Sequence, residues 1–229
     1  MVLNRRDFIA MVGAAGAVGF YGSPALAQTA AAAPLHGKGK KDVRTTTIVV
    51  LGDSLSAEYG LRRGTGWVAL LEKKLAKEPI AAKVVNASIS GDTTSGGRAR
   101  LAAVLEQHHP THLIIELGGN DALRGLPLQA TEDNLDQMTK AAQKAGAKVV
   151  IVGMQVPPNY GAAYGERFSG LFAQVARAND AALVPFLLKG VADGDNPTRL
   201  FQSDRIHPVA EAHPIMLANV WPALRKLLP

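Results

Sequence analysis

The segment Thr45–Leu51 reads TTTIVVL, runs directly into GDSLS (residues 52–56), and decides the fold. Its residues are β-branched or apolar without polar alternation, which predicts a strand buried on both faces. Strands of that kind belong to parallel sheets, and ligands bind such sheets at the carboxyl ends of their strands. We therefore expect a parallel α/β sheet, with polar chemistry where this first strand ends.

Four further strand-like runs follow along the chain, separated by segments with apolar residues at helical spacing. The expected strands are Lys83–Ala87, Thr111–Leu117, Lys148–Met154 and Ala182–Leu187. The expected helices are Gly66–Lys77, Gly97–His108, Thr131–Ala145 (capped by Thr131), Arg167–Asn179 and Ala210–Leu228. Strands that alternate with helices of this length predict βαβ units and a parallel sheet with helices on both faces.

Composition excludes several classes of protein. Of 229 residues, 47% are hydrophobic and 19% are charged, which excludes a disordered chain. Cysteine is absent, which excludes disulfides, thiolate catalysis, Cys-ligated zinc and iron–sulfur clusters. The net charge of +6 arises partly from the short stretch GKGKKDVR at residues 37–44, and no stacking aromatics accompany it. We therefore expect neither nucleic-acid binding nor, beyond the N-terminal region, a membrane span.

The N-terminal segment has the three parts of an export signal. Arg5 and Arg6 precede an apolar run over residues 10–21, and Ala25-Leu26-Ala27 forms a small-residue cleavage site. The arginine pair resembles a twin-arginine signal, which is read by the machinery that exports folded proteins. We expect a signal peptide over residues 1–27, a flexible linker over 28–44 and one domain over 45–229. The expected location is periplasmic or secreted, in a bacterium, after signal peptidase has cut near Ala27.

Polar residues follow the expected strands at the edge where ligands bind. Ser54 comes after the first strand, Gly91 after the second and Asn120 after the third, while Asp204 and His207 precede the last helix. Taken singly, each residue is also typical of a helix cap, a turn or a surface position. Their joint occurrence at strand ends favours a catalytic site over these alternatives.

These residue types fit acyl transfer to water. A serine hydroxyl needs a base, and His207 is suited to that task because imidazole titrates near neutrality. Asp204, three residues earlier, is expected to orient the imidazole. A serine at a strand-to-helix turn places its backbone N–H at a helix N-terminus, where a developing oxyanion is stabilised. The Gly91 N–H and the Asn120 side-chain amide would add two further donors to this oxyanion hole.

The four motifs together resemble the SGNH (GDSL) hydrolase family over about residues 48–228. The four motifs are GDSLS, the glycine after SIS, GGND, and the Asp204–His207 pair. Two longer strings, VVNASISGDTTSGG and IELGGNDALRGLP, are similar to the periplasmic thioesterase, arylesterase and lysophospholipase branch of this family. The resemblance implies a three-layer, flavodoxin-like fold with five parallel strands. It also implies Ser54 as nucleophile, Asp204 and His207 as its partners, oxyanion donors from Ser54, Gly91 and Asn120, and no metal or cofactor.

The expected substrate is a small ester, or a lipid-like acyl, aryl, lysophospholipid or thioester molecule. Two Gly/Pro-rich loops, residues 123–128 and 157–165, are predicted beside the site, where Leu123, Tyr160 and Tyr164 would cover an acyl chain. Arg205 stands where this branch often has glycine, which suggests a preference for anionic substrates. A carbohydrate O-deacetylase and a non-catalytic binding protein remain alternatives, and the oligomeric state is not predicted.

Overall fold

A computed structural model of the chain describes residues 45–229, and the predicted signal peptide and linker lie outside the described residues. Five strands form one sheet in which every pair is parallel, in the order β2-β1-β3-β4-β5. They are β1 (Thr46–Gly52), β2 (Ala82–Asn86), β3 (His112–Glu116), β4 (Lys148–Val152) and β5 (Ala182–Val184). The predicted five-stranded parallel α/β fold is confirmed.

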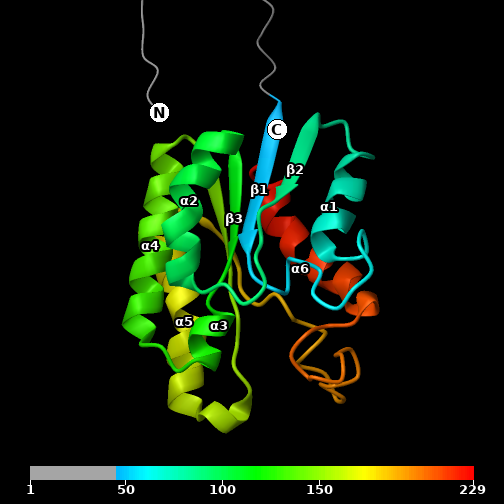
Figure 1. The fold of residues 1–229 in the computed structure, drawn as a ribbon, viewed down its shortest axis with the longest axis vertical. Coiled ribbons are helices and arrows are strands. Elements are labelled where there is room, and N and C mark those ends of the chain that lie inside the picture. Colours follow the sequence, from blue (N-terminus) through cyan, green and yellow to red (C-terminus); the bar gives the residue numbers. More distant parts are fainter. Residues whose placement is uncertain (1–44) are drawn as a thin grey trace, which may run out of the picture. The chain divides into compact units, whose positions relative to one another are not determined.

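Helices cover both faces of the sheet, giving three layers (Figure 1). On one face lie α1 (Trp67–Leu75) and α6 (His213–Arg225), which pack against each other. The opposite face carries α2 (Thr94–His108), α4 (Leu128–Lys144) and α5 (Ala162–Ala178). The short helix α3 (Gly119–Leu123) and the 3-10 turns Pro158–Tyr160 and Ala210–Ala212 complete the fold.

The core lies on both faces of the central strands. Residues 48–51 of β1 and 113–115 of β3 are fully buried, as the continuous apolar runs predict. Parallel pairing aligns Gly52 of β1 with Glu116 of β3. The polar segments that follow these two strands therefore emerge side by side, at the end of the sheet beside α3 (Figure 1).

Three helices begin earlier than their sequence patterns predict. Helix α2 begins at Thr94 instead of Gly97. Helix α4 begins at Leu128, so Thr131 lies inside the helix and its predicted role as a cap is wrong. The Thr131 hydroxyl instead donates to the carboxylate of Asp121 at 3.3 Å. Helix α5 begins at Ala162, so part of the predicted loop over residues 157–165 is helical. Apolar periodicity identifies the buried face of a helix and does not show where its first turn begins.

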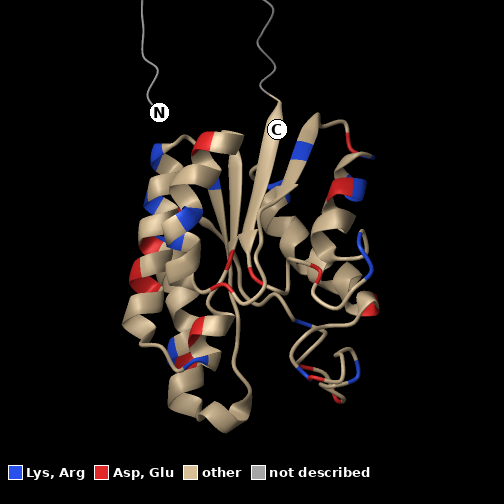
Figure 2. Ribbon diagram, in the orientation of Figure 1, with Lys and Arg blue, Asp and Glu red and all other residues tan. Residues whose placement is uncertain are grey.

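Charged residues are distributed over the helices and loops of the domain. Figure 2 shows Lys and Arg interspersed with Asp and Glu along the outer helices, with no single basic face in this view. Within the described part of the chain, none of the helices has both the length and the apolar character needed to cross a membrane.

A buried carboxylate joins three helices next to the end of β3. Asp121 of α3 is 1% exposed and accepts the backbone N–H of Thr94 at 2.9 Å. It also accepts the hydroxyls of Thr94 and Thr131. One side chain thereby holds the start of α2, the interior of α4 and the helix that carries Asn120.

Replacing Asp121 with Ala is expected to lower the free energy of unfolding by about 2–3 kcal/mol, because a buried N–H and two hydroxyls lose their acceptor. Chemical denaturation measures the change. Asp133→Ala on the exposed side of α4 is the matched control and should change stability by less than about 0.5 kcal/mol. Equal stability of the two variants would contradict a structural role for the Asp121 carboxylate.

Candidate active site

Ser54 lies in a tight turn that follows β1. The backbone N–H of Ala57 donates to the Asp53 carbonyl at 2.9 Å, and the N–H of Leu55 donates to the Asp53 side chain at 3.0 Å. The next α-helix begins only at Trp67. The expectation that Ser54 stands at a helix N-terminus is therefore wrong, and stabilisation of an oxyanion there must come from individual N–H groups.

The structure brings Ser54, His207 and Asp204 into one chain of hydrogen bonds. His207 Nε2 lies 2.9 Å from Ser54 Oγ, and His207 Nδ1 lies 2.7 Å from Asp204 Oδ2. Because an ionised carboxylate only accepts, Nδ1 carries the proton and Nε2 is free to accept the serine proton. This is the geometry that a general base needs to activate a hydroxyl.

Asp204 both shapes its loop and faces the imidazole. Its Oδ1 accepts the backbone N–H groups of Ile206 at 2.9 Å and of His207 at 3.0 Å. These bonds lower the pKa of Asp204 to about 2. The largest effect comes from the backbone N–H of His207, and the next largest comes from the His207 side chain. Asp204 is therefore a carboxylate at neutral pH.

Two residues that the sequence analysis did not identify support His207. The ring of Tyr59 lies 4.2 Å from the imidazole, centroid to centroid. The Gln202 side chain donates to the carbonyls of Tyr59 at 3.0 Å and of Pro208 at 3.2 Å, which joins the serine loop to the histidine loop. No sequence signal distinguishes either residue, because their roles arise from contacts between distant segments.

The three predicted oxyanion donors differ in what they contact. Within residues 45–229, no acceptor receives the backbone N–H of Ser54 or Gly91. Gly91 has φ +78°, a conformation that favours glycine, and its carbonyl accepts from Arg124 Nη2 at 2.7 Å. By contrast, Asn120 Nδ2 donates to Asp53 Oδ2 at 3.0 Å and to the Asp92 carbonyl at 2.9 Å.

Two buried carboxyl groups lie directly behind the nucleophile. Asp53 is 2% exposed and Glu116 is 1% exposed. Burial raises the pKa of Asp53 to about 6 against the opposing hydrogen bond from the Leu55 N–H. Burial and the neighbouring Asp53 raise the pKa of Glu116 well above its ordinary value. At neutral pH Asp53 is therefore mainly ionised, while burial and the charge of Asp53 both favour the neutral form of Glu116.

The predicted substrate residues take different places. Leu123 ends α3 and is 52% exposed, while Arg205 is exposed in the loop between Asp204 and His207. Tyr160 and Tyr164 lie in the 3-10 turn and in the first turns of α5, with ring centroids 5.8 Å apart. The Tyr164 ring stacks on the ring of Phe168, which belongs to the core. Within the described domain, neither tyrosine hydrogen-bonds with Ser54, His207 or Asp204.

Exposed apolar side chains gather on the loops that carry these groups. The exposed large hydrophobic residues of the described chain are Tyr59, Ile89, Leu123, Leu126 and Ile206. They follow β1, β2 and β3 or lie next to His207, and we call them the apolar rim. An apolar rim around a polar centre suits a substrate with a nonpolar acyl or aryl part.

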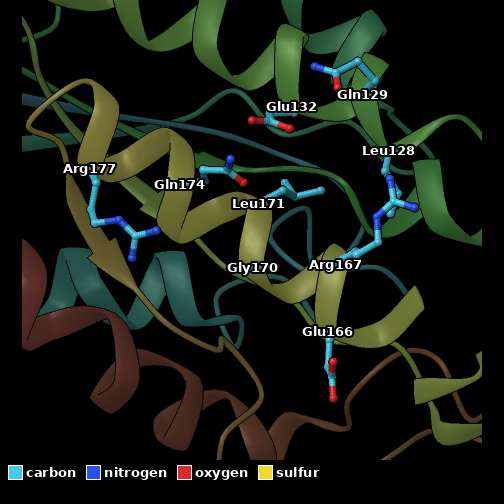
Figure 3. Close-up of a pocket in the computed structure, with 9 residues that line it drawn as sticks. All are labelled: Leu128, Gln129, Glu132, Glu166, Arg167, Gly170, Leu171, Gln174 and Arg177. Atoms are coloured by element: carbon cyan, nitrogen blue, oxygen red, sulfur yellow. The ribbon is translucent and has the colours of Figure 1, made fainter. Parts of the chain in front are cut away.

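A groove of about 520 Å³ lies elsewhere, between α4 and α5 (Figure 3). Its lining is polar, with Glu132, Arg167 and Arg177 among its residues, and contains none of the predicted site residues. Among residues 45–229, no three His, Cys, Asp or Glu side chains are grouped so as to hold a metal ion. The Ser54 loop is therefore the best candidate for chemistry in the described domain.

Known sequences similar to this chain carry names of ester-hydrolysing enzymes. The chain is 50% identical to "Esterase TesA" of Pseudomonas aeruginosa over 182 residues, which span 80% of this chain and 89% of that protein. It is 41% identical to "Thioesterase 1/protease 1/lysophospholipase L1" of Escherichia coli K12 over 170 residues, or 74% and 79% of the two chains.

Solved structures show the same similarity in three dimensions. The crystal structure of TesA matches with a TM-score of 0.77 at 50% identity, over 80% of this chain and all of that one. The esterase EstA from Pseudoalteromonas sp. matches with a TM-score of 0.73 at 40% identity, over 79% and 97%. The model of the GDSL-like Lipase/Acylhydrolase family matches residues 50–215. The chain therefore belongs to the GDSL-like lipase/acylhydrolase family and is a carboxylic ester hydrolase.

Proposed function

We propose that this hydrolase cleaves esters and thioesters of lipid-like acyl or aryl substrates through an acyl-enzyme on Ser54. The observation that carries the proposal is the continuous hydrogen-bond chain from Ser54 through His207 to Asp204. Relatives named esterase, thioesterase, lysophospholipase and arylesterase support this range of substrates, as does the apolar rim.

The first half of the reaction forms the acyl-enzyme. Ser54 Oγ attacks the acyl carbonyl carbon while His207 Nε2 accepts the hydroxyl proton, and the carbonyl oxygen becomes an oxyanion. Asp204 stabilises the imidazolium, and the N–H groups of Ser54, Gly91 and Asn120 stabilise the oxyanion. Collapse breaks the bond to the leaving oxygen or sulfur, which takes the proton from His207.

The second half returns the enzyme to its starting state. A water molecule gives a proton to His207 and attacks the acyl carbon, forming a second oxyanion in the same place. Collapse releases the carboxylic acid and returns the proton to Ser54 Oγ. Each half uses the same donors, so a single site serves both steps.

Hydrolysis of p-nitrophenyl esters with two to sixteen carbons tests the proposal. We expect Ser54→Ala to lower kcat/KM by at least about 10³-fold on every chain that the wild type cleaves. Ser203→Ala, an exposed serine beside Asp204, is the matched control and should retain activity. Retained activity in Ser54→Ala would refute the mechanism. Wild-type activity confined to acetate would favour a carbohydrate O-deacetylase over a lipid-like substrate.

Arg205 is expected to favour anionic substrates, because its guanidinium is exposed between two members of the proposed triad. We expect Arg205→Gly to lower kcat/KM for an ester with a negatively charged leaving group relative to its neutral analogue, by about 3- to 10-fold. Arg205 has φ +58°, so glycine should maintain or raise Tm. Arg205→Lys, which keeps the charge, is the control; an unchanged charge preference in Arg205→Gly would contradict the role.

We also propose that the protein is exported to the periplasm by the twin-arginine route, on the basis of residues 1–27. Changing Arg5 and Arg6 to Lys should leave the uncut chain in the cytoplasm, whereas the exported wild type should begin at Gln28. The chain offers a second adjacent pair, Arg62 and Arg63, which is exposed in the folded domain. The same double change there is the control and should not alter export; normal export of the Arg5/Arg6 variant would contradict the route.

A further inference from the structure

Asn120 differs from the other oxyanion donors because both of its amide N–H bonds already have acceptors. One goes to the Asp53 carboxylate at 3.0 Å, and the other goes to the backbone carbonyl of Asp92 at 2.9 Å. To stabilise an oxyanion, Asn120 must therefore share or redirect one of these bonds. An oxyanion is a stronger acceptor than a neutral carbonyl, so the bond to Asp92 is the one that it displaces.

Asp53 is placed to hold the other N–H through the reaction. It directly precedes Ser54, and its two oxygens have separate partners: Oδ1 accepts from the Leu55 N–H and Oδ2 accepts from Asn120. One buried carboxylate thus connects the turn of the nucleophile with a donor 67 positions later in the chain.

A carboxylate at this position also selects one orientation of the amide. The Asn120 side chain has an NH₂ group and a carbonyl oxygen that exchange places when the amide turns over. An ionised carboxylate only accepts, so it pairs with NH₂ and excludes the reversed orientation. The reversed amide would present its carbonyl oxygen toward the oxyanion and repel it.

We propose that Asp53 is a positioning residue of the hydrolytic reaction, whose carboxylate holds the Asn120 amide with an N–H directed at the oxyanion. This inference rests on the proposed function of Ser54. Asp53 does not contact the substrate in this role and acts through Asn120.

The groups that face Asp53 agree with a single negative charge there. Glu116 from β3 is buried beside it and accepts the Ser56 hydroxyl at 2.6 Å, and burial together with Asp53 raises the pKa of Glu116, which favours its neutral form. His207 favours the ionised form of Asp53, whereas Asp92, which is paired with Arg100 at 2.8 Å, opposes it. With a pKa of about 6, Asp53 gains a proton as the pH falls below 6, and it can then donate to the reversed amide.

A double-mutant cycle on kcat/KM tests whether Asp53 acts through Asn120. We expect Asn120→Ala to cost about 10²- to 10³-fold and Asp53→Asn to cost about 10- to 10²-fold in the wild-type background. In the Asn120→Ala background, Asp53→Asn should change the rate by less than about 2-fold, because the amide it positions is gone. The enzyme concentration used to calculate each rate is the concentration of serines that react with a phosphonate, so that misfolded protein is left out of the calculation.

The pH profile supplies a second readout that a structural role would not move. As the pH falls through about 6, the ratio of kcat/KM between the wild type and Asp53→Asn should shrink toward one, because Asp53 gains a proton and loses the charge that Asn lacks at every pH. Asp133→Asn, a matched change of an exposed aspartate, should keep the wild-type rate across the same pH range.

The outcomes separate this inference from the proposed function. If Ser54→Ala is inactive but the losses caused by the Asp53 and Asn120 changes multiply in the double variant, the positioning role is wrong and the serine mechanism stands. The same holds if the ratio of wild-type to Asp53→Asn rates does not change with pH. If Ser54→Ala retains activity, the proposed function fails, and the positioning role that rests on Ser54 fails with it.

Discussion

The site depends on the parallel pairing of β1 with β3. Both strands are buried on two faces. Hydrophobic burial fixes their register, because a shifted strand would carry polar residues from its ends into the core. That register sets Gly52 beside Glu116, and the chain after each strand then enters the same small volume. Asp53, Ser54 and Asn120 meet there because two apolar strands end together, although the residues are far apart in sequence.

The strand starts could be predicted closely from the sequence, whereas the end of β5, at Val184 instead of Leu187, and several helix starts could not. Apolar runs such as residues 48–51 are unambiguous because every side chain in them is buried. The start of α5 at Ala162 is hidden by Gly161 and Gly165, which are typical of a loop. Thr131 has the sequence signature of a helix cap, but its hydroxyl bonds to Asp121 from inside α4. A local pattern cannot show whether a hydroxyl will accept a backbone N–H as a cap or donate to a carboxylate elsewhere in the fold.

The same distinction applies to the site. Ser54 was predicted from its place after a strand, and Asp204 and His207 were predicted from their chemistry and spacing before the last helix. The structure brings the three into hydrogen-bond contact. Tyr59 and Gln202 were not predicted, since a ring contact and two bonds to carbonyls depend on how distant loops meet. The pair of buried carboxyl groups escaped prediction too, because Glu116 reads in sequence as one polar residue at the end of a strand.

Two aspartates face His207 from opposite environments, and their pKa values separate their tasks. Asp204 is partly exposed, and backbone N–H groups hold its pKa near 2, so its charge is constant and it can orient the imidazole at any working pH. Asp53 is buried and has a pKa of about 6, so it loses its negative charge when the pH falls below about 6. A charge so close to a developing oxyanion would oppose catalysis by repulsion alone. The place of Asp53 next to the nucleophile is therefore best explained by the direction it gives to the Asn120 amide.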